Sequence, residues 1–231
     1  MTAPPLVLLD LDGTLTDSAP GIITSLRATY VALGLPMPND AALRTFVGPP
    51  LVPSFRTHGV PGERVAEAVA TYRTDYAAHG MWKNAVFAGI PQALAVLRAA
   101  GVTLLIATSK PMRFAGPITQ RFALADAVDG VFGAPPDLVS SDKAAVIAAA
   151  LASPAAAGWD PARMLMVGDR CHDVAGARAH GIDTLGAGWG YGPAGELAAA
   201  GAAAVVGQPD ELAGAVLTRF HRAERAHHRL S

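Results

Sequence analysis

Two carboxylates, Asp10 and Asp12, follow a run of four apolar residues and directly precede Gly13. In an extended chain, residues i and i+2 point to the same side, so both carboxylates should project together beyond the end of a strand. Two like charges held so close are costly unless a cation lies between them or one of them carries a proton. Mg²⁺ would satisfy both. The alternative is an Asp-rich turn in which Gly13 supplies an unusual backbone angle, but the apolar strand before it favours a ligand site.

A second apolar run ends in Thr108-Ser109-Lys110. A hydroxyl and backbone amides at the end of a strand can donate hydrogen bonds to a phosphate oxygen. Ser109 can instead cap a helix that begins at Pro111, because serine is favoured before a helix and proline in its first turn. Both roles can hold at once, which makes Thr108 the better candidate for chemistry.

The remaining candidates are one lysine and two acids. Only three residues of this chain are lysines, and Lys143 stands at the start of a predicted helix. The positive end of the helix dipole disfavours a cation there unless a negative group lies opposite. Asp169 follows a further apolar run, and Asp173 lies in the first turn of the next predicted helix, where the dipole favours a carboxylate.

The elements that must position these residues alternate along the chain. Residues 90–206 read as short apolar strands separated by helices of about ten residues, a pattern typical of right-handed βαβ crossovers and a parallel sheet covered on both faces. Residues 17–86 show helical periodicity and no strand signal. The predicted strands are 6–9, 102–107, 128–132, 164–167, 182–185 and, more weakly, 205–206, and the predicted helices after residue 86 are 91–100, 111–122, 142–151 and 174–180.

In order and spacing these motifs resemble the haloacid dehalogenase (HAD) superfamily. Asp10-Leu11-Asp12-Gly13-Thr14 is similar to its first motif in the phosphatase branch, Thr108 to the second and Lys143 to the third. Gly168-Asp169-Arg170-Cys171-His172-Asp173 is similar to the fourth. One departure is Ala144, which stands where many relatives have proline after the lysine. The resemblance implies an α/β fold: a doubly wound, Rossmann-like parallel sheet with a small inserted all-helical cap. The core is then expected at 1–16 and 87–231, and the cap at 17–86.

The resemblance also implies roles. Asp10 would be the nucleophile that forms an aspartyl-phosphate, Asp12 the general acid and base, and Thr108 and Lys143 the groups that stabilise charge. Mg²⁺ would be held by Asp10, the backbone carbonyl of Asp12, Asp169 and Asp173. The residues expected to contact substrate are Gly13, Thr14, Gly48, Pro49, Ser109 and Lys110.

Several stretches, at 46–51, 86–90, 107–111 and 188–192, are similar to phosphoglycolate phosphatase-like and 5′-nucleotidase-like members of subfamily IA. The expected activity is therefore hydrolysis of a small phosphorylated metabolite. A 5′-nucleotidase and a β-phosphoglucomutase-like phosphomutase remain alternatives, as does a non-catalytic binding protein on the same fold. Gly48 and Pro49 would face the substrate, or would only break a helix.

The composition and net charge of the chain exclude further classes of protein and of partner. Of the 231 residues, 51% are hydrophobic and 16% charged, which indicates a substantial core rather than disorder. The formal net charge of −1 without a basic block argues against a nucleic-acid partner. The single cysteine, Cys171, excludes an intrachain disulfide, and the N-terminus lacks the pattern of a signal peptide. We therefore expect a cytoplasmic protein without membrane contact, as a monomer or homodimer.

Overall fold

The computed structural model describes the backbone of residues 4–135 and 142–227, and side chains as far as residue 222. A six-stranded sheet with strand order β5-β4-β1-β6-β7-β8 forms its centre, and every neighbouring pair is parallel. This confirms the predicted doubly wound α/β architecture. The strands are β1 (Leu6–Leu9), β4 (Thr103–Pro111), β5 (Gly130–Ala134), β6 (Met164–Gly168), β7 (Asp183–Ala187) and β8 (Ala204–Val206).

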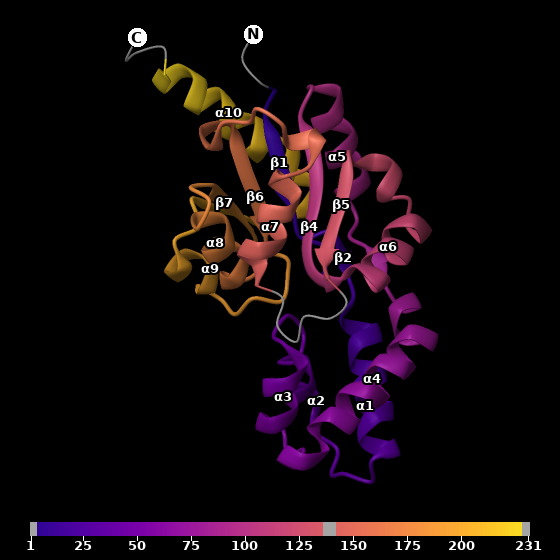
Figure 1. Cartoon of the computed structure of the whole chain (residues 1–231). Coiled ribbons are helices and arrows are strands. Elements are labelled where there is room, and N and C mark those ends of the chain that lie inside the picture. Colours follow the sequence, from indigo (N-terminus) through magenta and orange to yellow (C-terminus); the bar gives the residue numbers. More distant parts are fainter. Residues whose placement is uncertain (1–3, 136–141, 228–231) are drawn as a thin grey trace.

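Both faces of β1 are buried, which explains its unbroken apolar sequence. Val7 and Leu9 belong to a hydrophobic cluster that includes helices α5 (Ile90–Ala99) and α10 (Leu212–His227). Leu6 and Leu8 point to the opposite face, into a second cluster that includes helices α7 (Lys143–Leu151) and α8 (Cys171–Arg178). Figure 1 shows the sheet between these two helical layers.

The register of the central strands brings the predicted motifs to one edge. Leu9 of β1 lies beside Ile106 of β4 and Val167 of β6. Asp10 and Asp169 directly follow the carboxyl ends of β1 and β6, and Thr108 lies two residues beyond Ile106 on the neighbouring strand β4. Open α/β sheets bind ligands at this edge.

Four helices lie beyond the same edge of the sheet, at the bottom of Figure 1: α1 (Ala19–Ala32), α2 (Asp40–Arg44), α3 (Leu51–Thr57) and α4 (Val65–Ala78). Buried aromatic side chains join them, because the Phe55 ring lies 5.3 Å from that of Phe46, 6.1 Å from that of Tyr30 and 6.5 Å from that of Tyr72, centroid to centroid. This group therefore carries its own apolar packing.

One prediction about the segment 17–86 was wrong. The sequence predicts no strand in 17–86, yet β2 (Thr16–Asp17) pairs antiparallel with β3 (Ala85–Val86). Two-residue strands are too short to give an alternating pattern, so sequence periodicity misses them. The pair ties together the two chain segments that connect the four helices to the sheet.

The remaining helices around the sheet are α6 (Met112–Arg121) and α9 (Glu196–Ala200). Helices α5 to α8 match their predicted positions within a few residues, whereas α9 and α10 were not predicted. Ser109 is not the N-cap residue of α6: β4 continues through Pro111, which directly precedes the first residue of the helix. Within the described ranges, none of the helices is both long and apolar enough to span a bilayer.

Candidate active site

Three buried carboxylates converge at the carboxyl ends of β1 and β6. Asp10, Asp169 and Asp173 each offer one oxygen, and these three oxygens all lie within 4.8 Å of one another. Asp169 and Asp173 are each only 1% exposed. Carboxylate oxygens at this spacing are the donor set that hard divalent cations prefer.

Lys143 is the cation that lies against this cluster. Its Nζ is 2.7 Å from Asp10 Oδ1 and 2.7 Å from Asp173 Oδ1, and it donates a hydrogen bond of 3.1 Å to the carbonyl of Ala107. Lys143 is the first residue of α7, so negative groups do lie opposite this helix start, as the dipole argument requires. One ammonium therefore neutralises part of the charge of three acids.

The electrostatics of the cluster call for more positive charge than Lys143 supplies. Burial raises the pKa of Asp10 to about 6 although Lys143 opposes the rise. Burial also raises the pKa of Asp169 to about 8, and the charges of Asp10 and Asp173 act in the same direction. A divalent cation would relieve this repulsion, so the residues present fit a bound metal ion.

Asp12 lies outside the three-carboxylate cluster and pairs with the second buried lysine. Lys110 Nζ is 2.6 Å from Asp12 Oδ2, while Asp12 Oδ1 is buried without a hydrogen-bond partner among the described residues. The ammonium of Lys110 also lies 5.0 Å from the ring centroid of Tyr76, a residue of α4. The four-helix group therefore reaches the immediate neighbourhood of Asp12.

Sequence reasoning missed Tyr76. Its ring stacks on Tyr72 with a centroid distance of 5.5 Å. Burial raises the pKa of the Tyr76 hydroxyl, and the nearby Lys110 ammonium opposes this rise. Both tyrosines fall on the apolar stripe of α4, so periodicity marks them as core residues. The only signal was a pair of polar-tipped aromatics four residues apart on the helix nearest the sheet.

Gly13 and Thr14 pack directly against Asp169. Gly13 has φ +80°, and a Cβ built there would lie 2.3 Å from Asp169 Oδ2, so this turn requires glycine. Thr14 Oγ1 donates to Asp169 Oδ1 (3.3 Å), and the backbone N–H of Tyr191 donates to Asp169 Oδ2 (2.8 Å). Trp189 donates to the Thr14 carbonyl (3.0 Å). The loop at 188–192, which contains Trp189 and Tyr191, thus holds both Asp169 and the first motif in place.

The other predicted residues divide between this edge and the four-helix group. Thr108 is buried beside the cluster, and its hydroxyl accepts a hydrogen bond from the backbone N–H of Lys110 (3.2 Å). Ser109, between them, is half-buried. Gly48 and Pro49 lie in the turn between α2 and α3, where Arg170 of the fourth motif contacts Val47 and Gly48.

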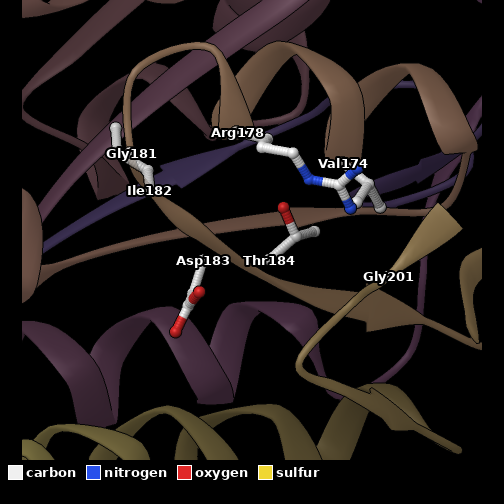
Figure 2. Close-up of a pocket in the computed structure, with 7 residues that line it drawn as sticks. All are labelled: Val174, Arg178, Gly181, Ile182, Asp183, Thr184 and Gly201. Atoms are coloured by element: carbon white, nitrogen blue, oxygen red, sulfur yellow. The ribbon is translucent and has the colours of Figure 1, made fainter.

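A separate pocket of about 180 Å³ lies at the opposite end of the sheet (Figure 2). Asp183, which lines it, is the first residue of β7, whereas the carboxylate cluster lies at the strands' carboxyl ends. Its charged groups have partners: Arg178 donates to the carbonyl of Ala200, and Asp183 pairs with Arg219. This pocket is not part of the candidate active site.

The sequence profile of the haloacid dehalogenase-like hydrolases matches residues 7–187, which include every motif described above. The chain belongs to this family. A predicted phosphatase from Clostridium acetobutylicum has a similar solved structure, with a TM-score of 0.84 and 36% identity over 94% of this chain and all of that one. The family assignment and the HAD fold predicted from the motifs are therefore confirmed.

Two curated relatives in this HAD family carry different activities in their names. A 5′-nucleotidase of Pseudomonas aeruginosa is 40% identical over 196 residues, which cover 84% of this chain and 87% of that protein. The tyrosine-protein kinase PtkA of Mycobacterium tuberculosis is 46% identical over 192 residues. That alignment covers 83% of this chain and 65% of PtkA, so this chain spans slightly less than two thirds of that relative. Phosphoglycolate phosphatases are also among the relatives.

Proposed function

We propose that this protein is a Mg²⁺-dependent phosphomonoester hydrolase that acts on a small phosphorylated metabolite, in the manner of phosphoglycolate phosphatases. The observation that carries the proposal is the convergence of Asp10, Asp169 and Asp173. Lys143 pairs with Asp10 and Asp173, and Asp12 follows Asp10 by two residues. Family membership and the phosphatase names of several relatives support it.

In the proposed reaction, a carboxylate oxygen of Asp10 attacks the phosphorus atom in line with the leaving alkoxide and forms an aspartyl-phosphate. Asp12 gives its proton to the leaving oxygen and then takes one from the water that hydrolyses the intermediate. Oδ1 of Asp12 suits this role, because it has no hydrogen-bond partner in the described part of the chain and Lys110 occupies the other oxygen of the same carboxylate.

Asp10, Asp169, Asp173 and the backbone carbonyl of Asp12 would hold the Mg²⁺ ion. When bound, the ion would offset negative charge on the phosphoryl group and on the carboxylates. Lys143 holds a fixed positive charge at Asp10. Burial alone would lower the pKa of Lys143, but the charges of Asp10 and Asp173 outweigh burial and raise it, so the ammonium stays protonated.

The substrate would lie between the sheet edge and the helices. We propose that Thr108 and Lys143 stabilise the transferring phosphoryl group, and that the residues in contact with substrate are Gly13, Thr14, Gly48, Pro49, Ser109 and Lys110. Residues 17–86 would form a cap that closes over a core made of 1–16 and 87–231. The position of α1–α4 beyond the strand ends supports this division.

A second candidate shares the phosphorylated carboxylate but differs in the acceptor. The similarity to a protein named tyrosine-protein kinase favours testing transfer to a hydroxyl other than that of water. A phosphomutase would also pass the phosphoryl group to a substrate hydroxyl. In either case, radiolabelled phosphate would appear on the acceptor instead of in solution.

The deciding experiment measures phosphate release from p-nitrophenyl phosphate with and without Mg²⁺, followed by kcat/KM for phosphoglycolate, nucleoside monophosphates and sugar phosphates. We expect metal-dependent release, with the highest kcat/KM for phosphoglycolate. A highest value for nucleoside monophosphates would replace the phosphoglycolate-like assignment with a 5′-nucleotidase. No release at any Mg²⁺ concentration would overturn the proposal in favour of a binding protein.

A further inference from the structure

Arg170 connects the metal-binding end of β6 to the turn between α2 and α3. Its Nη1 donates a hydrogen bond of 3.0 Å to the carbonyl of Val47, 123 residues away in the sequence. Val47 is itself buried, with 2% of its surface exposed. A contact from the sheet therefore ends on a buried residue of the four-helix group.

Glu196 fixes the side chain of Arg170 in this direction. Its Oε1 accepts from Arg170 Nε at 2.9 Å, and its Oε2 lies 3.4 Å from Nη2, which makes a two-pronged pair. The same Oε1 accepts from the backbone N–H of Cys171 at 2.8 Å, at the start of α8. The Arg170 and Glu196 side chains are only 16% and 17% exposed, so water screens this pair weakly.

The backbone of Arg170 is bound to the carboxylate cluster. Its N–H donates to Asp173 Oδ2 at 3.0 Å, and the preceding residue is Asp169. Arg170 thus contacts a candidate metal ligand, Asp173, through its backbone and the turn between α2 and α3 through its guanidinium.

Gly48 shows that the turn is shaped for this contact. A Cβ at Gly48 would lie 2.3 Å from Arg170 Nη1, and its φ of +105° is one that side-chain-bearing residues rarely adopt. The glycine thus lets the backbone approach the guanidinium. This contact accounts for the glycine at position 48.

We propose that Arg170 is a positioning residue that latches the turn at 47–51 against the active-site edge, so that the turn closes over the substrate. The expected kinetic effect rests on the proposed function, whereas the contact between Arg170 and the turn does not depend on it. Tyr76 contacts the sheet domain through Lys110 and Phe114, whose ring is 5.3 Å away, so the helices are held at a second point.

The test uses the full chain, without metal or substrate, and measures amide hydrogen exchange in the peptide covering residues 46–52. In Arg170→Met we expect exchange there to be about tenfold faster or more, because a hydrogen bond from a charged donor is lost. Gly48→Ala should give the same effect without altering the β6 end. Arg27→Met, which breaks an exposed ion pair with Asp40, is the matched control and should leave this exchange unchanged.

The kinetic readout is hydrolysis of p-nitrophenyl phosphate. For Arg170→Met we expect KM to rise about tenfold and kcat to change less than about threefold, because the latch holds the bound substrate and does not touch the reacting atoms. Unchanged exchange in both Arg170→Met and Gly48→Ala would overturn the latch, as would equal acceleration in Arg27→Met. If the wild-type protein is inactive but exchange is accelerated in the variants, the proposed function is wrong and the latch is confirmed.

Discussion

Lys143→Met is the substitution whose cost the structure defines best. The ammonium lies 2.7 Å from one oxygen of Asp10 and 2.7 Å from one of Asp173, and the residue is 5% exposed. At an effective dielectric constant near 20, each such contact is worth roughly 4 kcal/mol or more of attraction, offset in the native protein by desolvation of the three charges. Methionine fits the space but leaves two buried carboxylates facing each other. We expect the free energy of unfolding to fall by about 3–5 kcal/mol.

The assay is urea unfolding at pH 7.5 after treatment with EDTA, with Arg219→Met as the control. Arg219 and Asp183 form an ion pair with side chains 42% and 56% exposed, so its loss should cost only about 0–1 kcal/mol. Mg²⁺ should restore part of the stability of Lys143→Met, since the ion would take over the charge of the lysine. If Lys143→Met unfolds within about 1 kcal/mol of the wild type without metal, the electrostatic account of the cluster is wrong.

Three further outcomes follow from the same geometry. Folding raises the pKa of Asp10 to about 6 and that of Asp169 to about 8, so the folded protein binds more protons than the unfolded chain above pH 4. Stability without metal should therefore fall as the pH rises from about 4 to 8. Calorimetry should show a larger gain in Tm from Mg²⁺ at pH 8 than at pH 5.5. Gly13→Ala should displace Asp169 and raise the Mg²⁺ concentration needed for half-maximal stabilisation, and an unchanged midpoint would refute the close contact. Tyr76→Phe removes a buried hydroxyl that interacts with the Lys110 ammonium, a proposed substrate contact, so KM for p-nitrophenyl phosphate should rise; an unchanged KM would mean that the hydroxyl does not help to hold Lys110 in place.

Most of the sheet could be predicted from the sequence, because strands buried on both faces are apolar without interruption. The run before Asp10 is the clearest case: all four residues of β1 are buried. Each acid or hydroxyl that ends such a run then lies at the same edge, whatever the details of packing. The convergence of Asp10 and Asp169 was therefore expected from order and strand type alone.

The residues that join the helices to the sheet could not be predicted in this way. Arg170 and Glu196 are 26 residues apart in the sequence and meet only because α8 and α9 pack together. Tyr76 lies on the apolar stripe of a helix, where a contact with Lys110 looks the same in sequence as ordinary core packing. Ser109 was assigned to a cap because local propensity favours it, but the strand continues past it and tertiary pairing with β5 decides the outcome.

The most direct test of the account is the rate of Mg²⁺-dependent p-nitrophenyl phosphate hydrolysis by Asp10→Asn. This variant keeps the shape of the side chain, and Lys143 retains Asp173 as a partner, so the melting temperature should stay close to that of the wild type. An amide cannot form the aspartyl-phosphate, and we predict that turnover falls by roughly 10⁴-fold or more. A folded Asp10→Asn protein that retains turnover within about tenfold of the wild type would contradict the central claim that this carboxylate is the nucleophile.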